Sequence, residues 1–419
     1  MANCYFRGDT PAVAQVNTVT VGGTAANGQV YSITINGKVA SYTANGSDTN
    51  ASITAALLVS IQNAQSSILE LAEMTWASPT ATTLTATANT PGYDFAFTSS
   101  ATGTGTLVTS TTTANKSPND WSLASNWSGG SVPATGDSVY LRSSSVNITQ
   151  GLSQSGVTLA LLDIDSTYTG QIGLPDINVS GGATSGYSEY RGVYLAISAT
   201  KINVGRGTGQ GSSLIRLNVG SNQCTLNIYA TSSPPSQGAY VVDFLGTHAS
   251  NAVNASRGSF MVAGKPGTTS TISVANIGSQ GSPASDVQAL FGDGCTLGTV
   301  LQEAGTVQYN CSLTTLTIAS GIAQILGTST IGTAVNFAGV LNYDTSGTLG
   351  SYTGGNGSLI DFSRVNVART VSACTLNYGA SYNDPGKTAT VSGSGIKVSC
   401  AFEQLGPIDF GQGRYILVS

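Results

Sequence analysis

The fold of this chain is decided by residues 295–361, CTLGTVLQEAGTVQYNCSLTTLTIASGIAQILGTSTIGTAVNFAGVLNYDTSGTLGSYTGGNGSLID. Four apolar residues recur here at intervals of 16, 18 and 18 residues: Leu297, Leu313, Ile331 and Leu349. A glycine stands eight residues after each of them: Gly305, Gly321, Gly339 and Gly357. A short run with the alternation of a β-strand follows each glycine, as in Thr306-Val307-Gln308-Tyr309.

A short, nearly constant period with glycine at one corner is typical of a solenoid built from stacked β-coils. Neighbouring coils would lie about 4.8 Å apart, with branched and small side chains stacked inside. Short apolar strands separated by Gly, Asn and Ser continue from residue 138 to the end of the chain. The repeats therefore predict a β-helix over residues 138–419.

The cysteines support the same repeat. A Cys-Thr-Leu or Cys-Ser-Leu triplet begins at Cys224, Cys295, Cys311 and Cys374. Residues two apart on a strand face the same side, so the pattern predicts that Cys and Leu both point inward. We expect buried free thiols that act as small apolar groups. A disulfide between adjacent coils and a reactive thiol are the alternatives.

Composition excludes several classes of protein. Only 8% of the 419 residues are charged, 52 are glycine, and five are glutamate. An ordinary soluble domain has about 25% charged residues, so a helical bundle and a typical α/β enzyme are disfavoured. The apolar share of 40% and the net charge of −5 disfavour disorder. A mainly β protein rich in turns fits these values.

Charge and hydropathy also limit the partners. The 15 Lys and Arg residues are scattered, which predicts no nucleic-acid surface. No run of 18 apolar residues exists, so we expect no membrane helix. The opening MANCYFRGD lacks the basic and apolar regions of a signal peptide, which favours synthesis in the cytoplasm. The single histidine, His248, and the absence of Cys-x-x-Cys disfavour a metal site.

A compact α+β unit is predicted before the β-helix. Asn36-Gly37 separates two alternating runs, 30–35 and 38–43, which is a strong hairpin signal. Apolar residues at steps of three and four from Ile53 to Leu71 predict a helix, capped within residues 48–50. Two further strands are expected at 83–87 and 93–97. The helix would cover one face of this small sheet, and residues 99–119 would form a linker or an exposed strand edge.

These features divide the chain into three parts. Residues 1–113 are interpreted as an N-terminal α+β docking module, residues 114–137 as a linker with a Trp-rich cap, and residues 138–419 as the β-helix domain. Trp121 and Trp127 are interpreted as a packing cap over the end of the core. A sugar-stacking site is the alternative interpretation of these two rings.

The residues that could carry catalysis are few. Asp163 and Asp165 would lie on one strand face, as a glycosidase pair could, but solvated surface carboxylates are the simpler interpretation. Asp243 and His248 lie near a serine without a Gly-x-Ser-x-Gly context. The glycine-rich segment 205–211 lacks the Gly-Lys-Ser/Thr ending of a phosphate loop. We therefore expect no enzyme activity, no catalytic or cofactor-binding residue, no metal ligand and no cofactor.

Two stretches resemble known families. Residues 6–16, FRGDTPAVAQV, resemble the opening of structural proteins from tailed bacteriophages and prophage-like clusters, as does the module with Ile33-Thr34-Ile35-Asn36-Gly37. Residues 121–137 resemble the "W…NW…G…P…GD" entry to β-helices of phage and autotransporter-like surface proteins. Together these matches cover about the first third of the chain, and no functional site carries over from them.

The resemblance implies a virion structural protein of the capsid-decoration (cement) type or of the head- or tail-fibre type. Its expected partners are its own copies, in a homotrimer, and the major capsid protein or another virion protein. A tailspike-type protein that binds or cleaves host-surface glycans is one alternative, and a bacterial β-helix adhesin is another.

Overall fold

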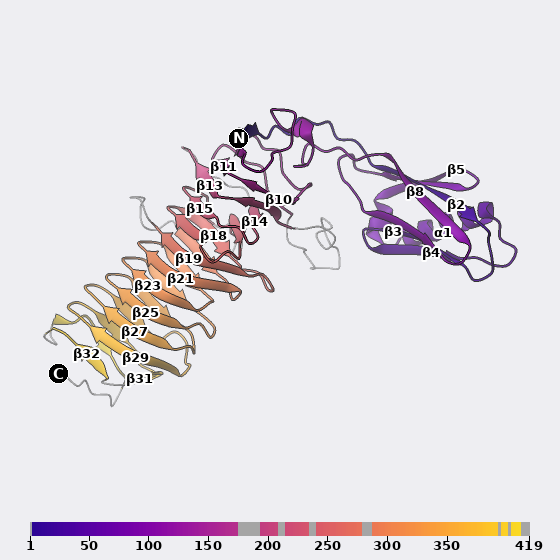
Figure 1. Ribbon diagram of the computed structural model, residues 1–419. Helices are drawn as coiled ribbons and strands as arrows, with labels where there is room; N and C mark the ends of the chain where they lie inside the picture. Colours follow the sequence, from indigo (N-terminus) through magenta and orange to yellow (C-terminus); the bar gives the residue numbers. More distant parts are fainter. Residues whose placement is uncertain are drawn as a thin grey trace.

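The computed structural model describes residues 2–174, 193–207, 214–233, 240–278, 287–392, 395–400 and 404–411. These residues form a long stack of parallel strands, with a smaller α+β module beside its N-terminal end (Figure 1). The predicted fold class is confirmed: the chain is mainly β, with a small α+β module and a β-helix.

Two parallel sheets make the walls of the β-helix, and the coils contribute strands to them alternately. The 14-stranded sheet contains β1 Asn3–Tyr5, β9 Ser138–Leu141, β11 Leu161–Asp165, β13 Lys201–Arg206, β15 Thr225–Ile228, β17 Ala252–Ala255, β19 Ser270–Ile277, β21 Cys295–Gln302, β23 Leu313–Ile318, β25 Ile331–Asn336, β27 Leu349–Gly354, β29 Arg369–Leu376, β31 Ala389–Val391 and β32 Ile396–Val398. The 12-stranded sheet contains β10 Ser153–Leu159, β12 Leu195–Ala199, β14 Ile215–Asn218, β16 Val242–Leu245, β18 Gly258–Val262, β20 Val287–Phe291, β22 Thr306–Tyr309, β24 Ile322–Ile325, β26 Val340–Tyr343, β28 Leu359–Asp361, β30 Ser381–Asn383 and β33 Ile408–Asp409.

The observed register confirms the repeat found in the sequence. Leu297 pairs with Leu313, Leu313 with Ile331, and Ile331 with Leu349, on successive strands of the 14-stranded sheet. All four side chains are buried. The period of 16 to 18 residues is therefore the length of one coil in this part of the stack.

The corners between the two sheets explain the repeated glycines. Gly305, Gly321 and Gly357 have φ values of +84°, +87° and +77°, a conformation that side chains with a Cβ atom rarely adopt. Gly339 has no positive φ, but a Cβ there would overlap Ile318 of the preceding coil. Backbone conformation and close stacking thus select glycine at this corner for different reasons.

One apolar core runs along the interior of the β-helix. Aromatic rings stack from coil to coil, as in the parallel pair Phe291 and Tyr309, whose centroids are 5.6 Å apart. The buried amide of Gln302 donates to the carbonyl oxygens of Gly305 (3.2 Å) and Ile322 (2.9 Å). The buried amide group of Gln302 is thereby satisfied, which avoids the cost of an unpaired polar group.

The module has its own core and two antiparallel sheets. Its elements are β2 Val16–Gly23, β3 Val30–Ile35, β4 Lys38–Thr43, α1 Asn50–Ala64, α2 Leu69–Ala72, β5 Met74–Thr80, β6 Thr83–Ala88, β7 Phe97–Ala101 and β8 Gly105–Thr113. One sheet has the order β5-β6-β2-β8 and the other the order β4-β3-β7. The predicted hairpin over 30–43 is confirmed, with positive φ at both Asn36 and Gly37.

Several details of the module differ from the sequence-based expectation. The helix starts from the N-cap Thr49 as expected but ends at Ala64, so Leu71 belongs to the separate α2. The strand expected at 93–97 begins only at Phe97. Of the two interpretations of residues 99–119, linker or exposed strand edge, the second is confirmed over residues 105–113, which form the edge strand β8 paired with β2.

The module is an insertion into the first coil rather than a separate N-terminal domain. Strand β1 pairs in parallel with β9, so residues 3–5 belong to the β-helix sheet and not to the module that was expected from residue 1. The two chain segments that lead to and from the module pair at Val13 and Lys116. Phe6 also packs into the β-helix core. The division expected at residue 113 therefore misplaces the first strand.

Candidate functional site

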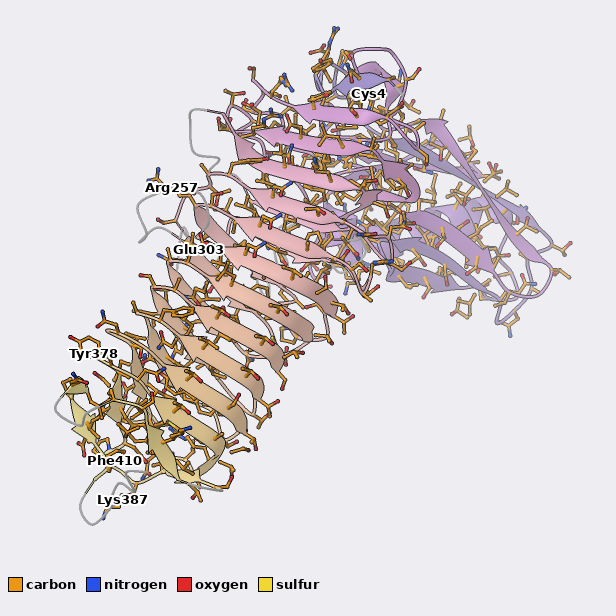
Figure 2. The ribbon with its side chains drawn as sticks, turned by 60° about the vertical axis from the view of Figure 1, so that its left-hand side comes forward. Cys4, Arg257, Glu303, Tyr378, Lys387 and Phe410 are labelled. Atoms are coloured by element: carbon orange, nitrogen blue, oxygen red, sulfur yellow. The ribbon has the colours of Figure 1, made fainter. Side chains whose placement is uncertain are left out.

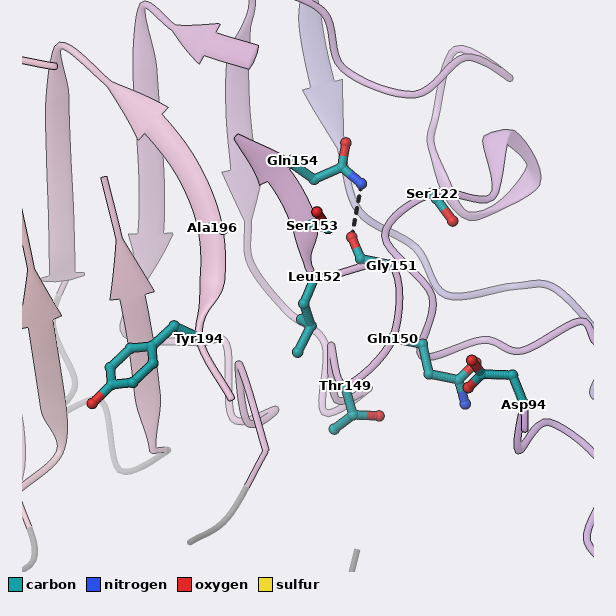
Figure 3. A pocket seen from close by; sticks show the side chains of 10 residues that line it. All are labelled: Asp94, Ser122, Thr149, Gln150, Gly151, Leu152, Ser153, Gln154, Tyr194 and Ala196. Atoms are coloured by element: carbon teal, nitrogen blue, oxygen red, sulfur yellow. Dashed lines mark hydrogen bonds between the residues drawn. The ribbon is translucent and has the colours of Figure 1, made fainter. Parts of the chain in front are cut away.

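A hollow of about 470 Å³ lies between the module and the first coils (Figure 3). It is lined by Asp94, Ser122, Thr149, Gln150, Gly151, Leu152, Ser153, Gln154, Tyr194 and Ala196. The amide of Gln154 donates to the carbonyl oxygen of Gly151 at 2.7 Å, which shapes one wall. Amides, hydroxyls and one carboxyl group line the hollow, so hydrogen bonding is the chemistry that it offers.

Gln150 joins the module to the β-helix. Its side-chain amide donates to the carbonyl oxygen of Gly92 and accepts from Asn115 at 2.9 Å. The backbone carbonyl oxygen of Gln150 accepts a hydrogen bond from the backbone N–H of Trp121 at 3.0 Å. Gln150 is buried, and sequence analysis missed it because a single Gln in an irregular stretch carries no pattern.

The two tryptophans form a packing cap. Trp121 is 0% exposed and Trp127 is 2% exposed, and their rings meet edge to face at 4.7 Å. The indole N–H of Trp127 donates to the carbonyl oxygen of Trp121 at 2.8 Å, and Phe6 packs against Trp127. A sugar needs an open ring face, so the sugar-stacking alternative is wrong for this pair.

Asp163 is buried, contrary to the expectation of a solvated surface carboxylate. Arg142 lies 3.4 Å and Arg206 4.0 Å from its oxygens. Asp165 accepts from the hydroxyl and backbone N–H of Thr167. The buried carboxylate of Asp163 thus has two arginine partners, because a buried charge requires a partner. The half-buried Asp165 instead accepts the hydrogen bonds of a turn.

Asp243 and His248 have different partners. The hydroxyl of Tyr194 donates to Asp243 at 2.8 Å, and Lys265 and Arg216 lie 3.2 and 3.9 Å away. Burial raises the pKa of Asp243, while these partners act to lower it. The Nδ1 atom of His248 accepts from the backbone N–H of Ser250.

The cysteines are free, and five of the six are buried. Burial raises the pKa of Cys224 and of Cys374 to about 12. The pKa of Cys295 is also raised. The largest cause is its hydrogen bond with Cys311, and the second largest is burial. Thiols with raised pKa values are poor nucleophiles, which agrees with the expected role as small apolar groups.

The glycine-rich segment 205–211 lies partly outside the described residues, because residues 208–211 are not among them. Within the described part of the chain, His, Cys, Asp and Glu form no group of three that could hold a metal ion. No helix among those residues has the length and hydropathy to cross a membrane.

No family model matches the chain, and no curated protein matches it.

Proposed function

We propose that this chain is a non-enzymatic structural protein of a tailed-phage virion, of the decoration or fibre type. In this proposal the inserted module docks on the particle, and the β-helix acts as a rigid spacer. The observation that carries the proposal is the arrangement of two parts with separate cores. A module with its own core is joined by a two-segment stem to one end of a long hydrogen-bonded stack.

The buried carboxylates of the β-helix support a structural role. Asp163 has two arginine neighbours, Asp243 has a lysine and an arginine, and Asp344 has Arg364 at 3.6 Å. Gln324 also donates to Asp344 at 2.8 Å. General acid–base catalysis needs carboxylates within reach of a substrate. Buried ion pairs instead satisfy charges within the stack.

The resemblance of residues 6–16 and of the module to phage structural proteins supports the virion assignment. The test uses particles that were assembled without this protein. The full chain should sediment with such particles. A variant in which Asn-Gly replaces residues 14–115 should stay in the supernatant, because it lacks the docking module.

Tyr378→Ala is the matched control, since this side chain is 58% exposed on a distant coil. It should bind particles as the unaltered chain does. Equal binding by the module-excised variant would reverse the assignment and make the β-helix wall the docking surface. Failure of the full chain to bind any such particle would contradict the virion role.

A further inference from the structure

A ladder of amide side chains runs along the outer face of the 14-stranded sheet. Asp163, Asn203, Asn227, Asn254 and Asn276 are register neighbours on five successive strands, β11 to β19. Each Asn Nδ2 atom donates to the side-chain oxygen of the preceding member. The four distances are 3.0, 3.1, 3.0 and 2.8 Å. We call these five residues the Asn ladder.

The Asn ladder leaves hydrogen-bonding capacity on its outer side. An amide group has two N–H donors and two acceptor lone pairs, and the ladder uses one of each at Asn227 and Asn254. At Asn276 the next register neighbour is Leu301, which offers no side-chain donor. Successive coils hold these groups about 4.8 Å apart. The ladder thus presents a fixed row of alternating donors and acceptors.

A groove lies over this row. Its volume is about 380 Å³, and its lining residues are Asn227, Ile228, Tyr229, Asn254, Ser256, Asn276, Leu301 and Glu303. Tyr229 is 40% exposed, so part of its ring is open to a ligand. Glu303 is also exposed and lies at the side of the stack in Figure 2. The groove therefore combines an amide floor, an open aromatic ring and a carboxylate.

We propose that this groove binds a neutral oligosaccharide along the axis of the β-helix. Sugar hydroxyls both donate and accept hydrogen bonds, which matches the outer side of the Asn ladder. The ring of Tyr229 offers an apolar face with a polar tip, which suits the mixed surface of a sugar ring. This inference goes beyond the docking role and does not depend on it.

The charges of the groove select against acidic ligands. Asp163, at one end of the Asn ladder, is already paired with Arg142 and Arg206. These arginines are thereby engaged, whereas Glu303 lines the groove and would repel a carboxylated sugar. An extended peptide is also disfavoured, because it would bind at a sheet edge through main-chain hydrogen bonds. The Asn ladder lies on a sheet face.

The groove binds and does not cleave. Glycoside hydrolysis uses two carboxyl groups about 5–9.5 Å apart across the scissile bond. Among the described residues that line the groove, Glu303 supplies the carboxyl group. Asp163 is two strands away from Asn227 and is held in ion pairs. We therefore expect saccharide binding without product formation.

The test screens the full chain against an array of neutral hexose and N-acetylhexosamine oligomers, beside uronic-acid and sialylated oligomers. Neutral oligomers should bind, and calorimetry on the best of them should give its Kd. Tyr229→Ala should raise that Kd about tenfold, because it removes the stacking face. Asn254→Ala, which interrupts the Asn ladder, should weaken binding as well.

Tyr378→Ala is the matched control, and it should leave the Kd unchanged because this exposed tyrosine lies far along the stack (Figure 2). The module-excised variant should also bind the saccharide, so this proposal and the docking role fail separately. Tyr229 is exposed, so its variant should fold even if Asn254→Ala does not. Absence of neutral binding, a preference for acidic oligomers, or an unchanged Kd for Tyr229→Ala would each overturn the proposal.

Discussion

At the scale of single residues, the corner glycines differ in how much space surrounds them. A Cβ atom on Gly321 would overlap the carbonyl oxygen of Gly305 in the preceding coil, whereas a Cβ atom on Gly357 would meet nothing within 4 Å. Both residues have positive φ. The pair therefore separates the cost of backbone conformation from the cost of crowding between coils.

We predict that Gly357→Ala lowers the free energy of unfolding by about 1–2 kcal/mol, the cost of a left-handed conformation. Gly321→Ala should lower it by about 3 kcal/mol or more, because the coils must also move apart. Denaturant unfolding of both variants measures the difference. Equal losses would mean that the stack yields easily at this corner.

The cysteines allow a second prediction at this scale. Cys295 and Cys311 lie on adjacent coils as free thiols, with raised pKa at Cys295. Adding a reducing agent should leave the melting temperature of the protein nearly unchanged. A disulfide closing their 15-residue loop would instead contribute about 3 kcal/mol. A fall of several degrees on reduction would favour the bridge.

At the scale of elements, the stem of the module makes excision feasible. Val13 and Lys116 exchange two backbone hydrogen bonds, 2.9 and 3.3 Å long. Such a pair has Cα atoms about 5.5 Å apart, which a two-residue turn can close. The cores of the module and the β-helix are separate clusters.

We predict that replacing residues 14–115 by Asn-Gly leaves a folded β-helix with cooperative unfolding. A simple truncation to residues 120–419 should be less stable, because it removes β1 and Phe6 and uncovers the edge of β9. Circular dichroism and thermal unfolding of the two variants provide the comparison. A truncated chain as stable as the spliced one would show that β1 contributes little.

At the scale of the whole molecule, exposed apolar side chains lie along the corner of the regular coils beside Gly321 and Gly339, which we call the outer wall. Ile322 is 39% exposed and Phe337 is 56% exposed, both in the regular coils. Apolar surface of this kind gains free energy when a second surface covers it. We therefore expect copies of the chain to associate through this wall.

We predict a homotrimer in solution, associated side by side through this wall. Light scattering on the purified protein at micromolar concentration measures the mass. Phe337→Ser should shift the equilibrium toward smaller species, while Tyr93→Ala, at an exposed side chain of the module, should not. A monomer in the unaltered protein would contradict the prediction.

Local patterns in the sequence were enough to predict the repeating coils and the first hairpin. The spacing of Leu297, Leu313 and Ile331 determined the coil length, since every coil must place an apolar residue at the same point of the core. Asn36-Gly37 determined the first hairpin, because both residues tolerate positive φ. These features depend on neighbouring residues or on a strict period, and such information is local.

Only the tertiary structure decided the features that join distant residues. The pairing of β1 with β9 joins strands that the whole module separates, and a three-residue strand has no periodic signal. The burial of Asp163 depends on Arg142 and Arg206, which come from neighbouring coils. The Asn ladder likewise arises because one Asn from each of four coils falls in the same register. Irregular coil lengths before residue 290 hide that register from the sequence, whereas hydrogen bonding between stacked strands fixes it in the fold.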